Sequence, residues 1–159
     1  MIVVAIIGIL ASLAIPVLIR VRMNANESTI KADLKTFSSA CEIFRSAQNP
    51  VRYAPNVVAL AGAVPQYIDG TWLVNPRHQY NFNYAVDAQG ITYSMIATPL
   101  PNGGFNTFCI DQSGIMVGSV NGAGAPAGNA TGCAGGRAKP HNEPSVNHAR
   151  ENPIVSGLT

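Results

Sequence analysis

Charged side chains are scarce in this chain of 159 residues. It has 10 basic and 8 acidic residues, which together make up 11% of the sequence, against roughly 25% in a typical soluble domain. So little charge argues against a freely soluble monomer. The net charge of +2 is too small to give the basic surface of a nucleic-acid-binding protein, so we expect no specific nucleic-acid partner.

Recognisable catalytic and metal-binding patterns are also missing. The eight acidic residues are widely scattered, and no Ser-His-Asp order, carboxylate pair or phosphate-binding loop is convincing. The histidines His78, His141 and His148 have no helical spacing of three or four residues, which a metal site on a helix would need. We therefore expect no enzyme, no metal ion and no cofactor.

The chain opens with a long stretch that has no charged side chains. Met1 to Ile19 contains no charged side chain, and about 19 residues of helix reach ~28 Å, enough to cross a bilayer. The run has no basic segment before it and no Ala-x-Ala cleavage site after it, so it does not resemble a removable signal peptide. The sequence predicts a membrane-spanning helix here.

The same helix is expected to continue as an amphipathic one and to end before Asn49-Pro50, because the residue before a proline avoids the α conformation. Glu27 precedes Lys31 by four residues, a favourable surface pair. Residues 1–22 form the apolar half and residues 23–50 the amphipathic half. The apolar stripe of the second half recurs at spacings of 4, 3, 4 and 3 and consists of Ile30, Leu34, Phe37, Cys41 and Phe44.

Short β-rich runs follow a connecting loop over residues 51–79. The four expected strands are Tyr80 to Val86, Ile91 to Ala97, Phe105 to Ile110 and Ile115 to Val120. Their short connections indicate an antiparallel meander over residues 80–120, with one face on the helix stripe. Residues 121–159 are rich in Gly, Ala, Asn and Pro and are expected to be irregular. The fold class is α+β.

The three cysteines permit one disulfide and one free thiol. Strand alternation turns Cys109 away from the core, which favours a bridge to Cys133 that stabilises the fold by ~3 kcal/mol. Cys41 lies on the buried helix stripe and is expected to be a free thiol. Pairing of Cys41 with Cys109 is the competing connectivity, and either bridge indicates export to an oxidising compartment.

The opening sequence MIVVAIIGILASLAIP, from Met1 to Pro16, resembles the N-terminal signature of the class III signal family, the type IV pilins and type II secretion pseudopilins. Gly8, Ala11 and Pro16 fall where that family places them. The family's mature chain opens with a methylated Phe and then Thr-Leu-Ile-Glu-Leu ahead of the position that matches Met1. Those residues are absent here, so the family's glutamate has no counterpart in this sequence.

The resemblance implies a structural subunit that polymerises into an extracellular pilus, with copies of itself as its main partner. It also implies residence in the inner membrane before assembly, followed by export to the cell surface. The implied machinery is a prepilin peptidase, an assembly ATPase, a platform protein and a secretin. Some secretion pseudopilins hold calcium in a late acidic loop, but residues 112–142 contain no carboxylate side chain. A type IV pilus subunit is therefore favoured over the major pseudopilin.

An exported domain held by one membrane helix is the alternative from a different class of protein. In the filament hypothesis, the large apolar side chains of the first half are buried between neighbouring subunits, because every side of that helix is apolar. These expected filament-core residues are Ile2, Val3, Val4, Ile6, Ile7, Leu10, Leu13, Ile15 and Leu18.

Two more expectations concern local structure and modification. Pro16 lacks a backbone donor and its ring crowds the carbonyl of Ser12, while Gly8 weakens the helix further. Family filaments have an extended stretch at the matching place, so we expect the helix to lose its regular hydrogen bonding between Gly8 and Pro16 in a fibre.

Of two glycosylation triplets, Asn26-Glu27-Ser28 and Asn129-Ala130-Thr131, the one at Asn129 is expected to lie in an exposed loop.

Overall fold

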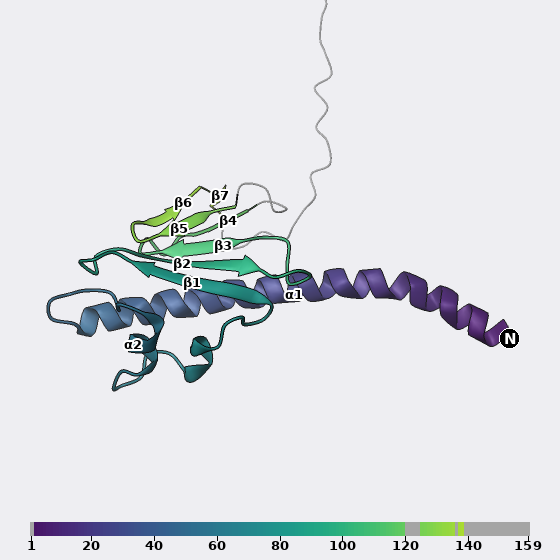
Figure 1. Ribbon diagram of the computed structural model, residues 1–159, viewed down its shortest axis with the longest axis horizontal. Coiled ribbons are helices and arrows are strands. Elements are labelled where there is room, and N and C mark those ends of the chain that lie inside the picture. The colour runs from purple at the N-terminus through teal and green to yellow at the C-terminus, as the bar shows by residue number, and fades with distance from the viewer. Residues whose placement is uncertain (1, 120–124, 136, 139–159) are drawn as a thin grey trace, which may run out of the picture.

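One long helix, α1 (Ile2–Ala47), runs along the molecule, and a sheet covers one side of its C-terminal half (Figure 1). The computed structural model describes residues 2–119, 125–135 and 137–138, and of residues 5, 10–14, 137 and 138 it describes the backbone alone. A hairpin lies on the outer face of the sheet, so three layers follow one another: helix, sheet and hairpin. The N-terminal half of α1 extends beyond all of them.

The predicted apolar stripe of α1 forms the centre of the core. Ile30, Leu34, Phe37 and Cys41 are fully buried, and Phe44 is nearly so. Residues spaced alternately four and three apart share one face of a helix, and that face is the one the sheet covers. The helix ends at Ala47, just before the expected stop at Asn49-Pro50.

Residues 51–79 form two short helices joined by turns. The first is α2 (Val57–Ala61), and Asn56 caps it by accepting a hydrogen bond from the Ala59 amide at 2.8 Å. The second is the 3₁₀ helix η1 (Gly70–Leu73), and its Trp72 ring lies 5.1 Å from the Phe37 ring, centroid to centroid. This connection therefore closes a side of the core that the sheet leaves open.

The main sheet is antiparallel with the strand order β1-β2-β3-β4-β7. Its first four strands are β1 (Tyr80–Val86), β2 (Tyr93–Pro99), β3 (Phe108–Asp111) and β4 (Met116–Gly118). Met95, Ile110 and Met116 stand side by side on adjacent strands and are buried. This row packs on α1, so the α+β class and the four-stranded antiparallel order are as predicted.

Three strands, β2, β3 and β4, begin later than the sequence predicted, because side chains compete for their first amides; before β4 the Ile115 amide donates to Ser113 Oγ. The amides of Phe105 and Asn106 donate to Glu27 on α1, so β3 starts at Phe108. The amides of Ile91 and Thr92 donate to the Asp87 carboxylate. These contacts use donors that a strand ladder would otherwise need.

The irregular segment predicted for residues 121–159 is wrong where the structure describes it. It contains β5 (Ala127–Asn129), β6 (Gly132–Ala134) and β7 (Arg137–Ala138). The first two form a hairpin, and the third adds a fifth strand beside β4. Their small residues show no alternation, but they permit close contact: a Cβ on Gly128 would lie 2.9 Å from Ser94 Oγ. The remainder of that prediction lies outside the described residues.

Candidate functional site

The N-terminal half of α1 is an exposed apolar arm, which we define as residues 2–21. It extends away from the described strands in Figure 1. Its exposed aliphatic side chains include three in succession, Ile2, Val3 and Val4, at 78%, 68% and 71%. Successive helix positions are about 100° apart, so these three cover most of the circumference, and no side of the arm is shielded by the chain's own head.

The structure places most of the expected filament-core residues on this arm as exposed side chains. They are Ile2, Val3, Val4, Ile6, Ile7, Ile15 and Leu18. The side chains of Leu10 and Leu13 lie outside the described residues. Sequence reasoning left out four further exposed members, although the same all-round apolarity marks them; they are Ile9, Val17, Ile19 and Val21. Burying one such side chain contributes about 1.5–3 kcal/mol, so the arm carries a strong drive toward association.

The backbone of the arm is a regular helix in this single chain. Pro16 lies inside α1 without ending it, and a Cβ on Gly8 would meet no atom within 4 Å. The side chain of Ser12 is outside the described residues. The expected loss of helix between Gly8 and Pro16 concerns the assembled fibre, so it stays a prediction.

The sequence predicted a membrane-spanning helix, and this prediction is not supported. Among the residues that the structure describes, no helix combines the length and the hydropathy needed to cross a membrane.

A buried carboxylate fastens the base of the arm to the head. Glu27 is only 6% exposed, and its Oε1 accepts hydrogen bonds from the amides of Phe105 at 2.8 Å and Asn106 at 3.0 Å. The Asn106 side-chain amide adds donors 3.2 and 3.0 Å from Oε1 and Oε2. Asn26, the residue before Glu27, donates from its Nδ2 to the Gly103 carbonyl at 2.9 Å. We call this set of contacts the Glu27 clasp.

Glu27 was expected to form a surface pair with Lys31, and this expectation is wrong because Glu27 is buried. The signal was present: Met23 and Glu27 extend the buried stripe of Ile30 and Leu34 backward at the same spacing of four and three. Met23 is indeed 9% exposed. A carboxylate on a buried stripe predicts several hydrogen-bond donors opposite it. Lys31, the expected partner, lies with its ammonium group 5.2 Å from the centre of the Phe108 ring.

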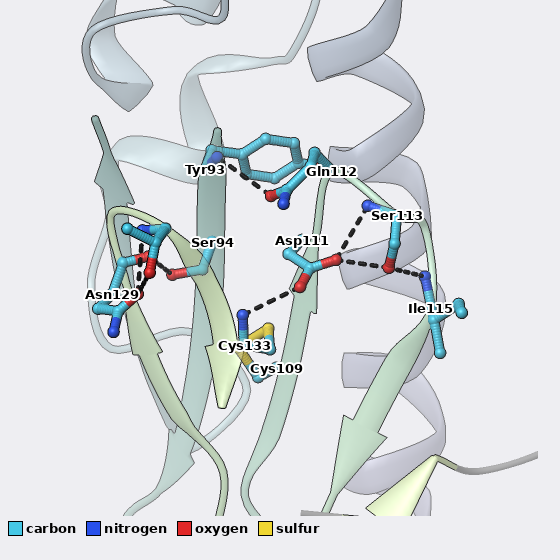
Figure 2. The surroundings of a disulfide bond; sticks show 10 residues. Tyr93, Ser94, Cys109, Asp111, Gln112, Ser113, Ile115, Asn129 and Cys133 are labelled. Atoms are coloured by element: carbon cyan, nitrogen blue, oxygen red, sulfur yellow. Dashed lines mark hydrogen bonds between the residues drawn. A yellow bond between two sulfur atoms is a disulfide. The ribbon is translucent and has the colours of Figure 1, made fainter. Parts of the chain in front are cut away.

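The predicted disulfide is present between Cys109 of β3 and Cys133 of β6, and Cys41 is a buried free thiol. Figure 2 shows the bridge beside Asp111, whose Oδ2 accepts a hydrogen bond from the Cys133 amide at 2.9 Å. Ser94 Oγ on β2 donates to the Asn129 carbonyl at 2.8 Å. Thr92 Oγ1 donates to the Ala130 carbonyl at 2.7 Å, so the disulfide and these hydrogen bonds together hold the hairpin on the outer face of the sheet.

Loss of the disulfide should weaken this attachment strongly. We expect the double variant Cys109→Ser, Cys133→Ser to lose about 3 kcal/mol of unfolding free energy, because the closed loop spans 24 positions. Denaturant titration of both proteins under oxidising conditions measures the loss. The single variant Cys41→Ser, which leaves the bridge intact, is the control for cysteine removal. A non-reduced peptide that joins Cys41 to either partner would contradict the assignment.

Hydrogen bonds also lower the pKa of Asp111. Partial burial opposes ionisation, but donors from Ser113 and the Cys133 amide outweigh it and hold the pKa of Asp111 below its ordinary value. The folded state therefore favours the carboxylate more than the unfolded chain does. This stabilisation is present above the unfolded pKa of about 4 and is lost as the pH falls through the lower folded pKa.

A pH series should reveal this contribution. We expect Asp111→Asn to lower the unfolding free energy at pH 7 and the difference from the unmodified protein to shrink below about pH 4, where the carboxyl group takes up its proton. Denaturant titrations of both proteins at pH 7 and at a pH below about 4 measure the difference. A constant difference from pH 7 to pH 2 would show that the charge of Asp111 contributes nothing.

The other polar cluster of the head is an ion pair that joins α1 to the connection. Asp33 Oδ2 lies 3.4 Å from Arg77 Nε and 3.8 Å from His78 Nε2. The Arg77 guanidinium lies 4.6 Å from the centre of the Trp72 ring, which helps to fix this cation. The cluster attaches residues far apart in sequence and has a structural role.

No metal centre is formed by the described residues, since no three His, Cys, Asp or Glu side chains among them converge on one point. His141 and His148 lie outside that part of the chain. Comparisons with protein-family models, curated proteins and solved structures find no match to this chain. The exposed arm is therefore the feature from which a function is best inferred.

Proposed function

We propose that this chain is the repeating subunit of a pilus-like filament, most like a type IV pilus subunit. The observation that carries the proposal is the arm: a helix of about 20 residues, ~30 Å long, with exposed aliphatic side chains on all sides. Water is a poor environment for such a surface. Burial against equivalent arms of other copies removes it from water without any change in the head.

The arrangement of the arm and the head supports an open polymer. The head covers only the C-terminal half of α1 (Figure 1), so several arms can gather into a bundle while their heads remain outside it. The arm is apolar around its circumference and can contact different neighbours with different sides. Contacts between unlike surfaces of identical subunits generate helical filaments when they do not close into a ring.

Exposed cations at the base of the arm limit how much of the helix can be buried in the bundle. Arg20 and Arg22 are exposed, and Met23 is the first buried side chain among those that the structure describes on α1. Burying an unpaired guanidinium is costly. The dry part of the proposed bundle therefore ends near Ile19, and these two arginines lie where solvent or acidic groups of a neighbouring copy can reach them.

The partners and location belong to the same proposal and rest on the resemblance of residues 1–16 to the class III signal family. They are the inner membrane before assembly, a prepilin peptidase, an assembly ATPase, a platform protein and a secretin, followed by the cell surface. A type II secretion pseudopilus subunit is the closest alternative. An exported domain anchored by one helix is the alternative from a different class, but an anchor alone does not require the Glu27 clasp to orient the head on the arm.

Electron microscopy of material sheared from producing cells tests the proposal. We expect fibres whose peptides, identified by mass spectrometry, come from this chain. Deletion of its gene should remove the fibres, and re-expression should restore them. Dispersed protein without fibres would contradict the filament and favour the anchored domain. Normal surface fibres that lack this chain, together with loss of protein secretion in the deletion strain, would favour the secretion pseudopilus.

Assembly should change the arm's backbone. We expect the hydrogen bonding of α1 to become irregular between Gly8 and Pro16 in the fibre, because Pro16 cannot donate a hydrogen bond and Gly8 lowers helix stability. An extended residue advances ~3.3 Å against about 1.5 Å in a helix, so the subunit should lengthen. A fibre structure that resolves these residues measures the change. An unbroken helix from Ile2 to Ala47 in the fibre would show this prediction to be wrong.

A further inference from the structure

Two asparagines occupy N-glycosylation triplets, and the structure gives them opposite environments. Asn26 is half-buried inside α1, and its Nδ2 donates to the Gly103 carbonyl at 2.9 Å. The residue after it is the buried Glu27. The hydroxyl of Ser28, the third residue of that triplet, donates to the Asn24 carbonyl. An enzyme cannot reach the Asn26 amide without breaking the clasp, so this triplet is closed.

Asn129 is accessible to solvent, whereas Asn26 is half-buried. It is the last residue of β5, it is exposed, and the turn of residues 130 and 131 follows it. Its side-chain Oδ1 accepts hydrogen bonds from the Thr131 amide at 2.9 Å and the Thr131 hydroxyl at 2.7 Å. Among the described residues, Asn129 Nδ2 has no hydrogen-bond partner. The amide and the hydroxyl of Thr131 thus both bind the oxygen of the Asn129 carboxamide, and the nitrogen of that carboxamide points away from them.

We propose that Asn129 is an N-linked glycosylation site of this protein. The donor is a sugar activated as a phosphate or diphosphate ester. Asn129 Nδ2 attacks the anomeric carbon, an N–C bond forms, and the C–O bond to phosphate breaks. The phosphate leaves with the electron pair, and a base of the transferase takes the amide proton. Hydrogen bonds to Oδ1 draw electron density from the carboxamide, which makes that N–H more acidic and eases its loss.

The position of the hairpin leaves room for a glycan. Strand β5, which ends at Asn129, lies on the outer face of the sheet, and α1 lies on the inner face (Figure 1). Ser94 and the disulfide hold the hairpin through the Asn129 carbonyl and Cys133 (Figure 2), and Thr92 binds the Ala130 carbonyl; none of these contacts uses the Asn129 side chain. In the filament, a sugar here projects outward and does not meet the bundle of arms. This last step rests on the proposed function, whereas the acceptor geometry does not.

Peptide mass spectrometry of protein isolated from producing cells tests the proposal. We expect a sugar mass on the peptide that carries Asn129, and enzymatic release in heavy-oxygen water should convert that asparagine into labelled aspartate. The peptide that carries Asn26 should remain unmodified. An unmodified Asn129, or a glycan on Asn26, would overturn the assignment.

Four variants sharpen the test. Asn129→Gln and Thr131→Val should lose the glycan, Thr131→Ser should retain it because the hydroxyl remains, and Asn26→Gln should leave it unchanged. A non-reduced peptide map that still shows the Cys109–Cys133 bridge confirms folding of each variant. A glycan that persists in Thr131→Val would contradict the proposed role of the hydroxyl. Fibres made of protein with an unmodified Asn129 would overturn the glycosylation proposal alone. A glycan on protein that never forms fibres would overturn the filament proposal alone.

Discussion

Replacement of Ile6 by aspartate in the arm should abolish fibre formation and leave the head folded. Ile6 is 52% exposed in the single chain and is expected to be buried between arms in the fibre. A carboxylate placed there would have no partner, and removing an ion from water costs several kcal/mol. Every subunit of the fibre would carry the same cost. Electron microscopy of sheared material measures assembly, and thermal unfolding measures the stability of the head.

Two control variants separate arm packing from other effects of the change. Ile6→Leu keeps the apolar volume and should assemble normally. Val64→Asp introduces the same acidic group at a side chain that is 99% exposed and lies outside the arm, and it should also assemble. Normal fibres from Ile6→Asp would contradict burial of the arm. Loss of fibres in Val64→Asp would show that added charge alone disrupts assembly.

Removal of the Glu27 carboxylate should cost the head about 3 kcal/mol or more of unfolding free energy. In Glu27→Ala the buried amide of Asn106 and the partly buried amide of Phe105 lose their acceptor, and so does the Asn106 side chain; an unsatisfied buried donor costs about 1–3 kcal/mol. Glu27→Gln keeps one acceptor oxygen but places an NH₂ group against the Asn106 amide, so an intermediate loss is expected. Denaturant titration ranks the three proteins.

The matched control is Glu42→Ala on the same helix. The Glu42 side chain is 44% exposed and pairs with Arg45 at 3.6 Å, and it also accepts a hydrogen bond from the Tyr53 hydroxyl. Exposed pairs of this kind contribute up to about 1 kcal/mol, so its loss should be smaller. Equal losses in Glu27→Ala and Glu42→Ala would contradict the role of the clasp.

Regular patterns of the sequence made much of the fold predictable. The spacing of Ile30, Leu34 and Phe37 identified the buried face of α1, because helix periodicity determines which side chains share a face. The short connections expected between the strands are turns that end in Gly90 and Gly114, whose φ values of 71° and 70° are positive, where glycine is favoured. Alternation in β3 placed Cys109 opposite the core and so favoured its bridge to Cys133.

Long-range contacts explain what the sequence did not reveal. Glu27 is bound by amides nearly 80 positions away; the stripe that it shares with Met23 and Ile30 indicates that it is buried, but no local pattern indicates which residues donate to it. The strands β5 and β6 have small residues without alternation, and their position depends on the disulfide and on Ser94 of a distant strand. The arm was identifiable because its signal is local: apolar residues without interruption and without charge.

A helical reconstruction of the fibre by electron cryomicroscopy would show where the arm lies in the assembled subunit. We expect residues 2–19 of every subunit to lie at the fibre axis and to contact the same segment of other copies, with the β5–β6 hairpin on the outer surface. A reconstruction in which these residues are exposed to solvent, or in which the heads form the axis and the arms point outward, would contradict this expectation.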